Sequence, residues 1–192
     1  MLIQFQSIQD VAIHDSCESF EISDLPSESY KNASLEFVQH RTTPYVQHIL
    51  SQMPFCYLRK RILIDIKVHH LKKGWYPAIP GWHVDGIQNI TQASSKTQNL
   101  YHLFVSGETS ITQFLSKRVQ REVDTKTPLD YNTLLDGITG VSIPKNTICS
   151  YTLAPHRAIP AEKDETRLLI RAVETDFVRP RNTPFDVYYQ KL

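Results

Sequence analysis

The sequence is poor in cysteine and contains no long apolar run. Its three cysteines, Cys17, Cys56 and Cys149, are far apart and form no Cys-x-x-Cys pair. This pattern fits a reducing compartment better than a disulfide framework. Because no stretch of about 18 apolar residues occurs and the N-terminus lacks a basic region followed by an apolar one, we expect neither a membrane span nor a signal peptide. These absences predict a soluble, cytoplasmic protein.

The chain also lacks an excess of one charge sign. Its 21 basic and 20 acidic residues give a formal net charge of +1, which argues against a general nucleic-acid coat or an anionic membrane as partner. The 6 glycines and 11 prolines are scattered, and low-complexity tracts and internal repeats are absent. We therefore predict a single domain over residues 1–192, with its core between about residues 62 and 176.

Two segments carry clear hydrophobic periodicity. Residues 43–53 predict a helix that packs on a sheet, because Thr43 can cap it and the apolar residues fall on one face. Residues 61–71 alternate, with isoleucine and valine on one side and Asp65 and Lys67 on the other. This alternation is typical of a half-buried strand.

Short β-like segments dominate the rest of the chain. They are rich in β-branched and aromatic residues, and turn residues separate them. A short helix is predicted at 128–138, among strands at 99–107, 109–115, 140–144, 147–154 and 166–174. Early helices followed by many short strands predict a mainly β fold, a sandwich or jelly roll with a few supporting helices.

One histidine-acid pair, His83-Val84-Asp85, has the spacing of metal ligands. In an extended strand residues i and i+2 point to the same side, so both side chains can reach one ion. Chance gives roughly 0.8 such pairs in a chain of this composition, so a metal-free loop pair is the alternative. His69 and His70 are adjacent, face opposite sides of a strand and cannot share an ion.

The order of the polar residues carries more information than any one of them. After the His83-x-Asp85 pair, His156 follows a later strand, and Arg167 lies on the next. Over roughly residues 62–174 the sequence resembles the iron(II)- and 2-oxoglutarate-dependent dioxygenase superfamily. The resemblance implies a double-stranded β-helix in which His83, Asp85 and His156 are the catalytic ligands of iron(II). It also implies that Arg167 binds the distal carboxylate of the co-substrate 2-oxoglutarate and that O2 is the oxidant.

A weaker likeness concerns the taurine-dioxygenase branch of that superfamily. The Gly-Glu-Thr segment at residues 107–109 is similar to a turn that places its threonine, here Thr109, on the co-substrate, although serine replaces the first glycine of that turn. This branch also has a second arginine four residues after the first, here Arg171, which faces substrate. The interval between Asp85 and His156 is much shorter than in that branch, so its substrate pocket is not implied.

The residue types suit this chemistry. Two imidazoles and one carboxylate on one face of an octahedral ion leave three adjacent positions open, two for a keto acid and one for oxygen. The planar fork of arginine binds a carboxylate through two charge-assisted hydrogen bonds. Because Arg167 and Arg171 share one face of their strand, burial of both would require two anionic partners. We therefore expect an anionic substrate group at Arg171.

The remaining candidates have structural alternatives. We assign Tyr101 to co-substrate binding and Trp82 to the substrate wall. A strand tyrosine such as Tyr101 or Tyr151 more often fills the core, however, and Trp82 could equally cover the open end of the barrel. Thr109 could be an ordinary strand residue. Arg171 could be a surface residue paired with Glu174 or Asp176.

These observations predict an oxygenase that converts 2-oxoglutarate to succinate while it hydroxylates or otherwise oxidises a small metabolite. A cupin-like enzyme that uses no keto acid would need the metal ligands but not Arg167. A non-catalytic jelly-roll binder is a third possibility. Basic residues near the C-terminus, Arg179 and Arg181, leave nucleotide or nucleic-acid substrates open. Nothing in the sequence indicates an oligomeric state.

Overall fold

The computed structural model describes residues 2–78, 80–85, 99–124, 129–176, 179–184 and 190–191. Over these residues the protein is mainly β, and all pairs of its named strands are antiparallel. The helices are few and short: α1 (Leu35–Gln39), α2 (Pro44–Gln52) and α3 (Tyr131–Leu134), with 3-10 turns η1 (Ile8–Asp10) and η2 (Ile22–Asp24). In the described part of the chain, no helix is long and apolar enough to cross a membrane.

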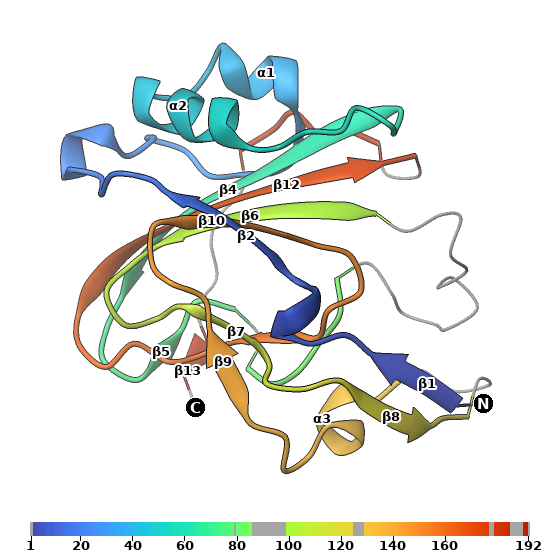
Figure 1. The fold of residues 1–192 in the computed structure, drawn as a ribbon. Helices are drawn as coiled ribbons and strands as arrows, with labels where there is room; N and C mark the ends of the chain where they lie inside the picture. Colours follow the sequence, from blue (N-terminus) through green and yellow to red (C-terminus); the bar gives the residue numbers. More distant parts are fainter. Residues whose placement is uncertain are drawn as a thin grey trace.

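Six strands form the larger sheet, here called the major sheet. Its order is β2-β10-β6-β12-β4-β3, and Figure 1 shows α1 and α2 lying across its outer face. The strands are β2 (Ala12–Ser16), β10 (Thr147–Tyr151), β6 (Leu100–Ser106), β12 (Glu165–Thr175), β4 (Arg61–Leu71) and β3 (Tyr30–Ser34).

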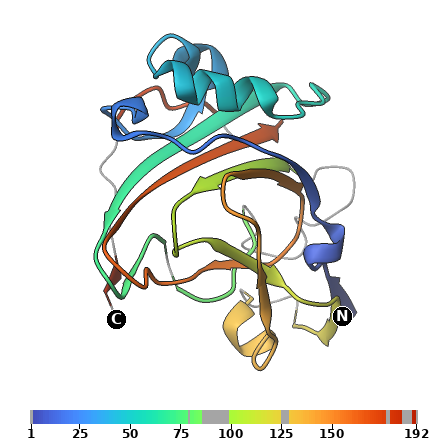
Figure 2. The ribbon, with the colours of Figure 1, turned by 60° about the vertical axis from the view of Figure 1, so that its left-hand side comes forward.

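A smaller sheet faces the inner side of the major sheet (Figure 2). This minor sheet has the order β11-β7-β9, and isolated bridges from Pro80 and His83 to β11 extend it. Its strands are β11 (His156–Ala158), β7 (Thr112–Leu115) and β9 (Gly140–Ser142). Two two-stranded sheets pair β1 (Leu2–Phe5) with β8 (Val119–Glu122) and β5 (Trp75–Tyr76) with β13 (Gln190–Lys191).

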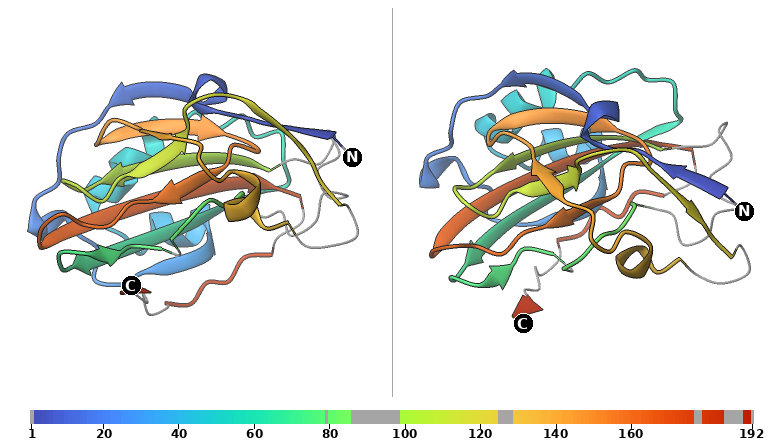
Figure 3. Two further views of the ribbon diagram at one scale, coloured as in Figure 1. Left: turned by 90° about the horizontal axis from the view of Figure 1, so that it is seen from below. Right: turned by 60° about the horizontal axis from the view of Figure 1, so that its bottom comes forward.

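The long strands β4 and β12 pair along their whole length, from Leu71 with Glu165 to Arg61 with Thr175. They run side by side when the molecule is viewed from below (Figure 3). Their outward side chains, such as Ile66 and Ile170, are fully buried against the apolar face of α2. Burial of each such side chain contributes about 1.5–3 kcal/mol. The predicted helix at 43–53 is therefore confirmed, including its packing on a sheet, and Thr43 accepts a hydrogen bond from the Val46 N–H.

The inner face of the major sheet is also covered, by the minor sheet. Phe114 of β7 belongs to one apolar cluster with Leu103, Val105 and Cys149 of the major sheet. The strand predicted at residues 61–71 is confirmed as β4, but the expectation that it is half-buried is wrong, because its polar side is buried too and Asp65 is only 1% exposed.

Other predicted elements are correct in kind but differ in extent. The helix expected at 128–138 is a single turn, α3, capped by the Asp130 side chain; residue 128 lies outside the described residues. The early part of the chain contains three strands, β1, β2 and β3, that the sequence pattern did not predict. These strands are four or five residues long, too short for a clear period.

Candidate functional site

The two histidines of the predicted ligand set are neighbours across a backbone ladder. His83 and His156 donate their backbone N–H groups to each other's carbonyl oxygens, at 3.0 and 2.9 Å. Their rings consequently lie side by side, with centroids 4.5 Å apart. The sequence predicted a strand at His83 and a loop at His156, whereas the structure has an isolated bridge at His83 and places His156 on the short strand β11.

Asp85 completes a compact group of three possible metal ligands. One ligand atom each from His83, Asp85 and His156 lies within 4.8 Å of the other two, and the His156 Nε2 atom is 3.4 Å from Asp85 Oδ2. Among the described residues this is the one group of three such side chains. Two imidazoles and a carboxylate that approach from one side suit a six-coordinate divalent ion with open positions.

Both imidazoles are oriented by the backbone. The Nδ1 atom of His83 is 3.3 Å from the Gly81 carbonyl oxygen, and that of His156 is 3.0 Å from the Ala154 carbonyl oxygen. A proton on each Nδ1 leaves Nε2 as the free lone pair, which is how metal-binding histidines are held. Gly81 has φ +95°, and a Cβ there would lie 2.2 Å from Asn132 Oδ1. The turn before His83 therefore requires glycine.

The protonation states of two ligands also suit a cation. Burial, with a contribution from His156, lowers the pKa of His83 to about 4. Burial would raise the pKa of Asp85, but the charges of Arg171 and His156 outweigh it and hold that pKa well below its usual value. At neutral pH the site therefore presents a neutral His83 imidazole and an ionised Asp85.

Asp85 is fixed by two donors from the major sheet. The Tyr151 hydroxyl donates to Asp85 Oδ2 at 3.0 Å, and Arg171 Nη1 lies 2.6 Å from the same oxygen. Arg171 also donates through Nη2 to Asp65 Oδ2 at 2.6 Å, and Asp65 accepts the Asn32 N–H at 2.7 Å. The guanidinium of Arg171 is therefore already shared between two carboxylates, neither of them Glu174 or Asp176.

Arg167 has very different surroundings. It is 2% exposed, its Nε makes no hydrogen bond, and its Nη1 lies 3.4 Å from His69 Nδ1. No described carboxylate forms an ion pair with it. Burial lowers the pKa of Arg167 to about 10, and the charge of Glu165 opposes this effect. A buried cation without a counter-ion is costly, so this position favours an anionic ligand.

A single cavity of about 480 Å³ contains both the three-ligand group and Arg167. Its wall includes Leu103 and Leu169 from the major sheet and Ala158 from the minor sheet. This volume falls in the usual range for small-molecule sites. The cavity therefore lies between the two sheets and combines a metal-ligand set with a buried cation.

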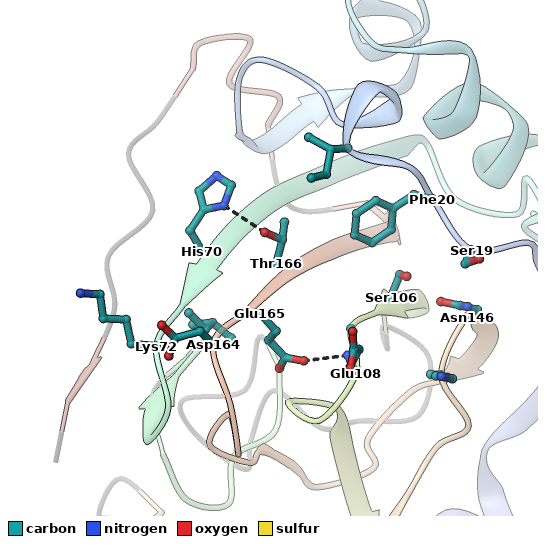
Figure 4. A pocket seen from close by; sticks show the side chains of 14 residues that line it. Ser19, Phe20, His70, Lys72, Ser106, Glu108, Asn146, Asp164, Glu165 and Thr166 are labelled. Atoms are coloured by element: carbon teal, nitrogen blue, oxygen red, sulfur yellow. Dashed lines mark hydrogen bonds between the residues drawn. The ribbon is translucent and has the colours of Figure 1, made fainter.

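The structure does not bring the other predicted residues to the cavity wall. Thr109 instead lies in a turn that the Glu165 carboxylate caps: the Thr109 backbone N–H and hydroxyl both donate to that carboxylate, as does the Glu108 N–H (Figure 4). Trp82 is buried in a separate apolar cluster. The Arg157 guanidinium lies over the Trp82 ring, 4.4 Å from the ring centroid. Tyr101 stacks on Tyr151 with centroids 5.3 Å apart and so supports the site from behind.

A larger, more open depression of about 770 Å³ lies beside the Glu165 turn, on the outer side of the major sheet (Figure 4). Its charged groups are of both signs and several already have partners: Glu165 accepts from the turn, Asp164 accepts the Lys73 N–H, and Glu108 pairs with Lys163. None of its described residues belongs to the ligand group. We therefore take the smaller cavity, which contains the ligand group, as the candidate site.

Sequence reasoning missed several residues at or behind the cavity wall. Asp65 and Lys67 were expected on a solvent-facing side, and His69 was set aside with His70; the structure places His69 inside and His70 outside. The sequence signal for these positions was the row of polar residues that alternates with isoleucine in β4, which indicates that the polar side chains share one face of the strand. Tyr151, expected in the core, is both buried and bonded to Asp85.

Comparisons with known proteins found no relative. A scan against models of protein families, a search of curated proteins and a search of solved structures each gave no match. Any function of this chain must therefore be inferred from its own geometry.

Proposed function

We propose that the protein is an iron(II)- and 2-oxoglutarate-dependent oxygenase. The observation that carries this proposal is the presence, in one cavity, of the His83, Asp85 and His156 group and of Arg167, a buried cation without a carboxylate partner. A keto acid with carboxylates at both ends satisfies both requirements, because one end can complete the coordination of the ion while the other pairs with Arg167.

The proposal includes a double-stranded β-helix, or jelly-roll, fold. Its support is the path of the chain, which passes from β4 in the major sheet to the bridges at residues 80–83 beside the minor sheet. It then continues through β6 (major), β7 and β9 (minor), β10 (major), β11 (minor) and β12 (major). Such alternation between two facing antiparallel sheets is how a jelly roll is wound.

The proposed roles follow from the contacts. His83, Asp85 and His156 would hold iron(II), which when bound supplies the oxidising chemistry that couples decarboxylation of 2-oxoglutarate to oxidation of a substrate C–H bond. Arg167 would bind the distal carboxylate of the keto acid. Tyr151 and Arg171 orient Asp85 through its Oδ2 atom, which we propose is their function in place of direct substrate contact.

A cupin-like enzyme that uses no keto acid is the alternative with the same ligand set. It gives no reason for a fully buried arginine beside the metal ligands, since such an arginine without an anion lowers stability. A structural role for Arg167 alone is disfavoured for the same reason. The presence or absence of a 2-oxoglutarate requirement separates the two functions.

The test is succinate formation by the metal-free protein after addition of iron(II), 2-oxoglutarate and O2, because such enzymes turn over the keto acid slowly without their main substrate. We expect succinate from the wild type, none from His83→Ala or Asp85→Ala, and wild-type amounts from His70→Ala. His70 is a matched control because it is exposed on the outer face of β4. Succinate formation that persists in Asp85→Ala, or that is absent from the wild type, contradicts the proposal.

A further inference from the structure

A group of polar side chains is buried on the outer face of the major sheet, on the side away from the cavity. Ser150 of β10, His102 of β6 and Glu174 of β12 lie on three adjacent strands (Figure 1). Ser150 pairs directly with His102, and Glu174 is two residues along β12 from the partner of His102. Their neighbours on this face, Phe104 and Ile148, belong to the apolar cluster under α2. Polar groups buried in such surroundings require an explanation.

The three side chains form one hydrogen-bonded chain. The Ser150 Oγ atom lies 2.8 Å from His102 Nδ1, and His102 Nε2 lies 3.1 Å from Glu174 Oε1. His102 is 1% exposed and Glu174 is fully buried, whereas Ser150 is partly exposed. The chain therefore runs from a hydroxyl at the surface to a carboxylate in the interior. A hydroxyl within reach of a base that a third group orients is the arrangement of an activated nucleophile.

The Glu174 carboxylate determines which nitrogen of His102 carries the proton. Its Oε1 atom accepts the Cys56 backbone N–H at 2.7 Å as well as the contact from His102 Nε2. Because a carboxylate only accepts hydrogen bonds, the proton of the neutral imidazole lies on Nε2, and the lone pair on Nδ1 faces Ser150. Ser150 therefore donates its hydroxyl proton to His102, which is the direction that a general base requires.

The surroundings of Glu174 favour a positive charge on His102 during a reaction. The Oε2 atom of Glu174 is buried and makes no hydrogen bond, and His102 is its one partner among the described ion pairs. An imidazolium formed at His102 would gain this carboxylate as a buried counter-ion, as in a serine-histidine-acid triad. Glu174 is therefore a positioning residue, whereas Ser150 and His102 are the reacting groups.

A second imidazole reaches the serine from the edge strand β2. His14 Nε2 lies 2.9 Å from Ser150 Oγ, and His14 lies at an irregularity in the pairing of β2 with β10, between Ile13 and Ser16. Such bulges re-aim side chains and are frequent next to active sites. Because the one proton of the serine hydroxyl goes to His102, His14 is the donor in this contact. Its N–H is placed to hydrogen-bond an oxyanion that forms beside Oγ.

We propose that Ser150, His102 and Glu174 form a second catalytic site, which hydrolyses small carboxylic esters independently of the proposed oxygenase. The Ser150 Oγ atom bonds to the ester carbonyl carbon while its proton passes to His102 Nδ1. The bond from that carbon to the alcohol oxygen then breaks, and the alcohol leaves with the proton. Water repeats both steps on the acyl serine, releases the acid and restores the hydroxyl. Ser150 lines neither of the two cavities described above, so the acyl group must be small.

The test is hydrolysis of p-nitrophenyl acetate by metal-free protein in the presence of a chelator. We expect release of more than one equivalent of nitrophenol and, after acid quenching, an acetyl group on Ser150 in peptide mass spectrometry. Ser51 is the matched control, because it is exposed and its hydroxyl donates to the His48 carbonyl oxygen, not to an imidazole. Ser51 should carry no acetyl group.

Four variants assign the roles. Ser150→Ala should abolish the turnover. His102→Gln should lower the rate by about 100-fold or more, the usual contribution of a general base, and His14→Gln should lower it by about tenfold. Glu174→Gln keeps an oxygen that can accept the Cys56 N–H and should lower the rate by about 100-fold. The denaturation curve of each variant reports whether it is folded.

The pH profile separates a positioning role of Glu174 from a structural one. Burial lowers the pKa of His102 below 6.5, although Glu174 opposes this effect. Because the neutral imidazole is the base, the wild-type rate should rise with pH and level off, with a midpoint below pH 6.5. Glu174→Gln removes the opposing charge and should move the midpoint to lower pH.

Three results would overturn the proposal. The first is the absence of ester turnover in the wild type. The second is a wild-type rate in Ser150→Ala, or acetylation of Ser51 as readily as of Ser150. The third is an unchanged rate and midpoint in folded Glu174→Gln, which would make the buried carboxylate a structural group.

Discussion

The two faces of the major sheet differ most in the middle of the paired strands β4 and β12. On the outer face, Ile64 and Ile66 of β4 meet Leu168 and Ile170 of β12 in an apolar cluster under α1 and α2. On the inner face, the same two strands carry the polar residues Asp65, Lys67, His69, Arg167 and Arg171. Both faces are largely buried.

The apolar outer face contributes mainly to stability, whereas the charged inner face belongs to the candidate site. The outer face lowers the free energy of the folded state by burying apolar area. The inner face buries charges. Replacement of a whole buried ion pair, or of a buried charge that has no partner, by apolar residues is often neutral or stabilising, whereas removal of one partner of a pair is destabilising. The proposed function gives the inner-face charges a ligand, so we expect substitutions there to weaken binding and substitutions on the outer face to lower stability.

The largest effect on stability is expected at the outer face. Ile66→Ala should lower the free energy of unfolding by about 2–5 kcal/mol, because it leaves a cavity in a close-packed cluster. Chemical denaturation measures this loss, and calorimetry with Mn(II) should give wild-type metal affinity for the folded fraction. A parallel loss of metal affinity would show that the two faces are not separable.

A smaller effect is expected where the inner face supports a ligand. Asp65→Asn removes one of the two carboxylates that share Arg171. The Arg171 guanidinium then competes more strongly with a bound ion for the Asp85 carboxylate. We expect Mn(II) affinity to fall by about tenfold, while Asp15→Asn, at an exposed position of β2, leaves it unchanged. Equal affinities in the two variants would remove Arg171 and Asp65 from the support of the site.

The smallest effect concerns pH and His69. Burial, together with the charge of Arg167, lowers the pKa of His69 from 6.5 to about 3. Below about pH 6.5 the His69 imidazole takes up a proton in the unfolded chain, whereas in the folded protein it stays neutral down to about pH 3. The free energy of unfolding therefore falls as the pH falls between these two values. In metal-free protein, His69→Gln should reduce that slope by up to about 1.4 kcal/mol per pH unit. Denaturation curves at several pH values check this, and an unchanged slope contradicts it.

Local pattern was sufficient for some of these features. The alternation of residues 61–71 and the Thr43 cap each predict an element correctly, because both depend on neighbours in sequence. The i, i+2 spacing of His83 and Asp85 likewise indicated that their side chains could meet, and the structure brings them together with His156.

Other features depend on how strands are paired, which a short sequence pattern does not encode. Arg171 lies opposite Asp65 because of the β4–β12 register, so its carboxylate partners could not be read from its own strand. Thr109 is held by Glu165, which is 56 residues away in sequence. The three-residue strand β11 is too short to carry a period.

Arg167 offers the most direct test. Its charge is buried without a described carboxylate partner, which lowers stability, and a bound anion would explain why it is there. Two measurements on Arg167→Met decide the matter: the affinity of the Mn(II)-loaded protein for 2-oxoglutarate and the free energy of unfolding without ligands. The account predicts that 2-oxoglutarate affinity falls by about 100-fold or more, while the free energy of unfolding is unchanged or rises by about 1–3 kcal/mol. Wild-type affinity combined with a loss of several kcal/mol of stability would contradict it, and would make Arg167 a structural residue.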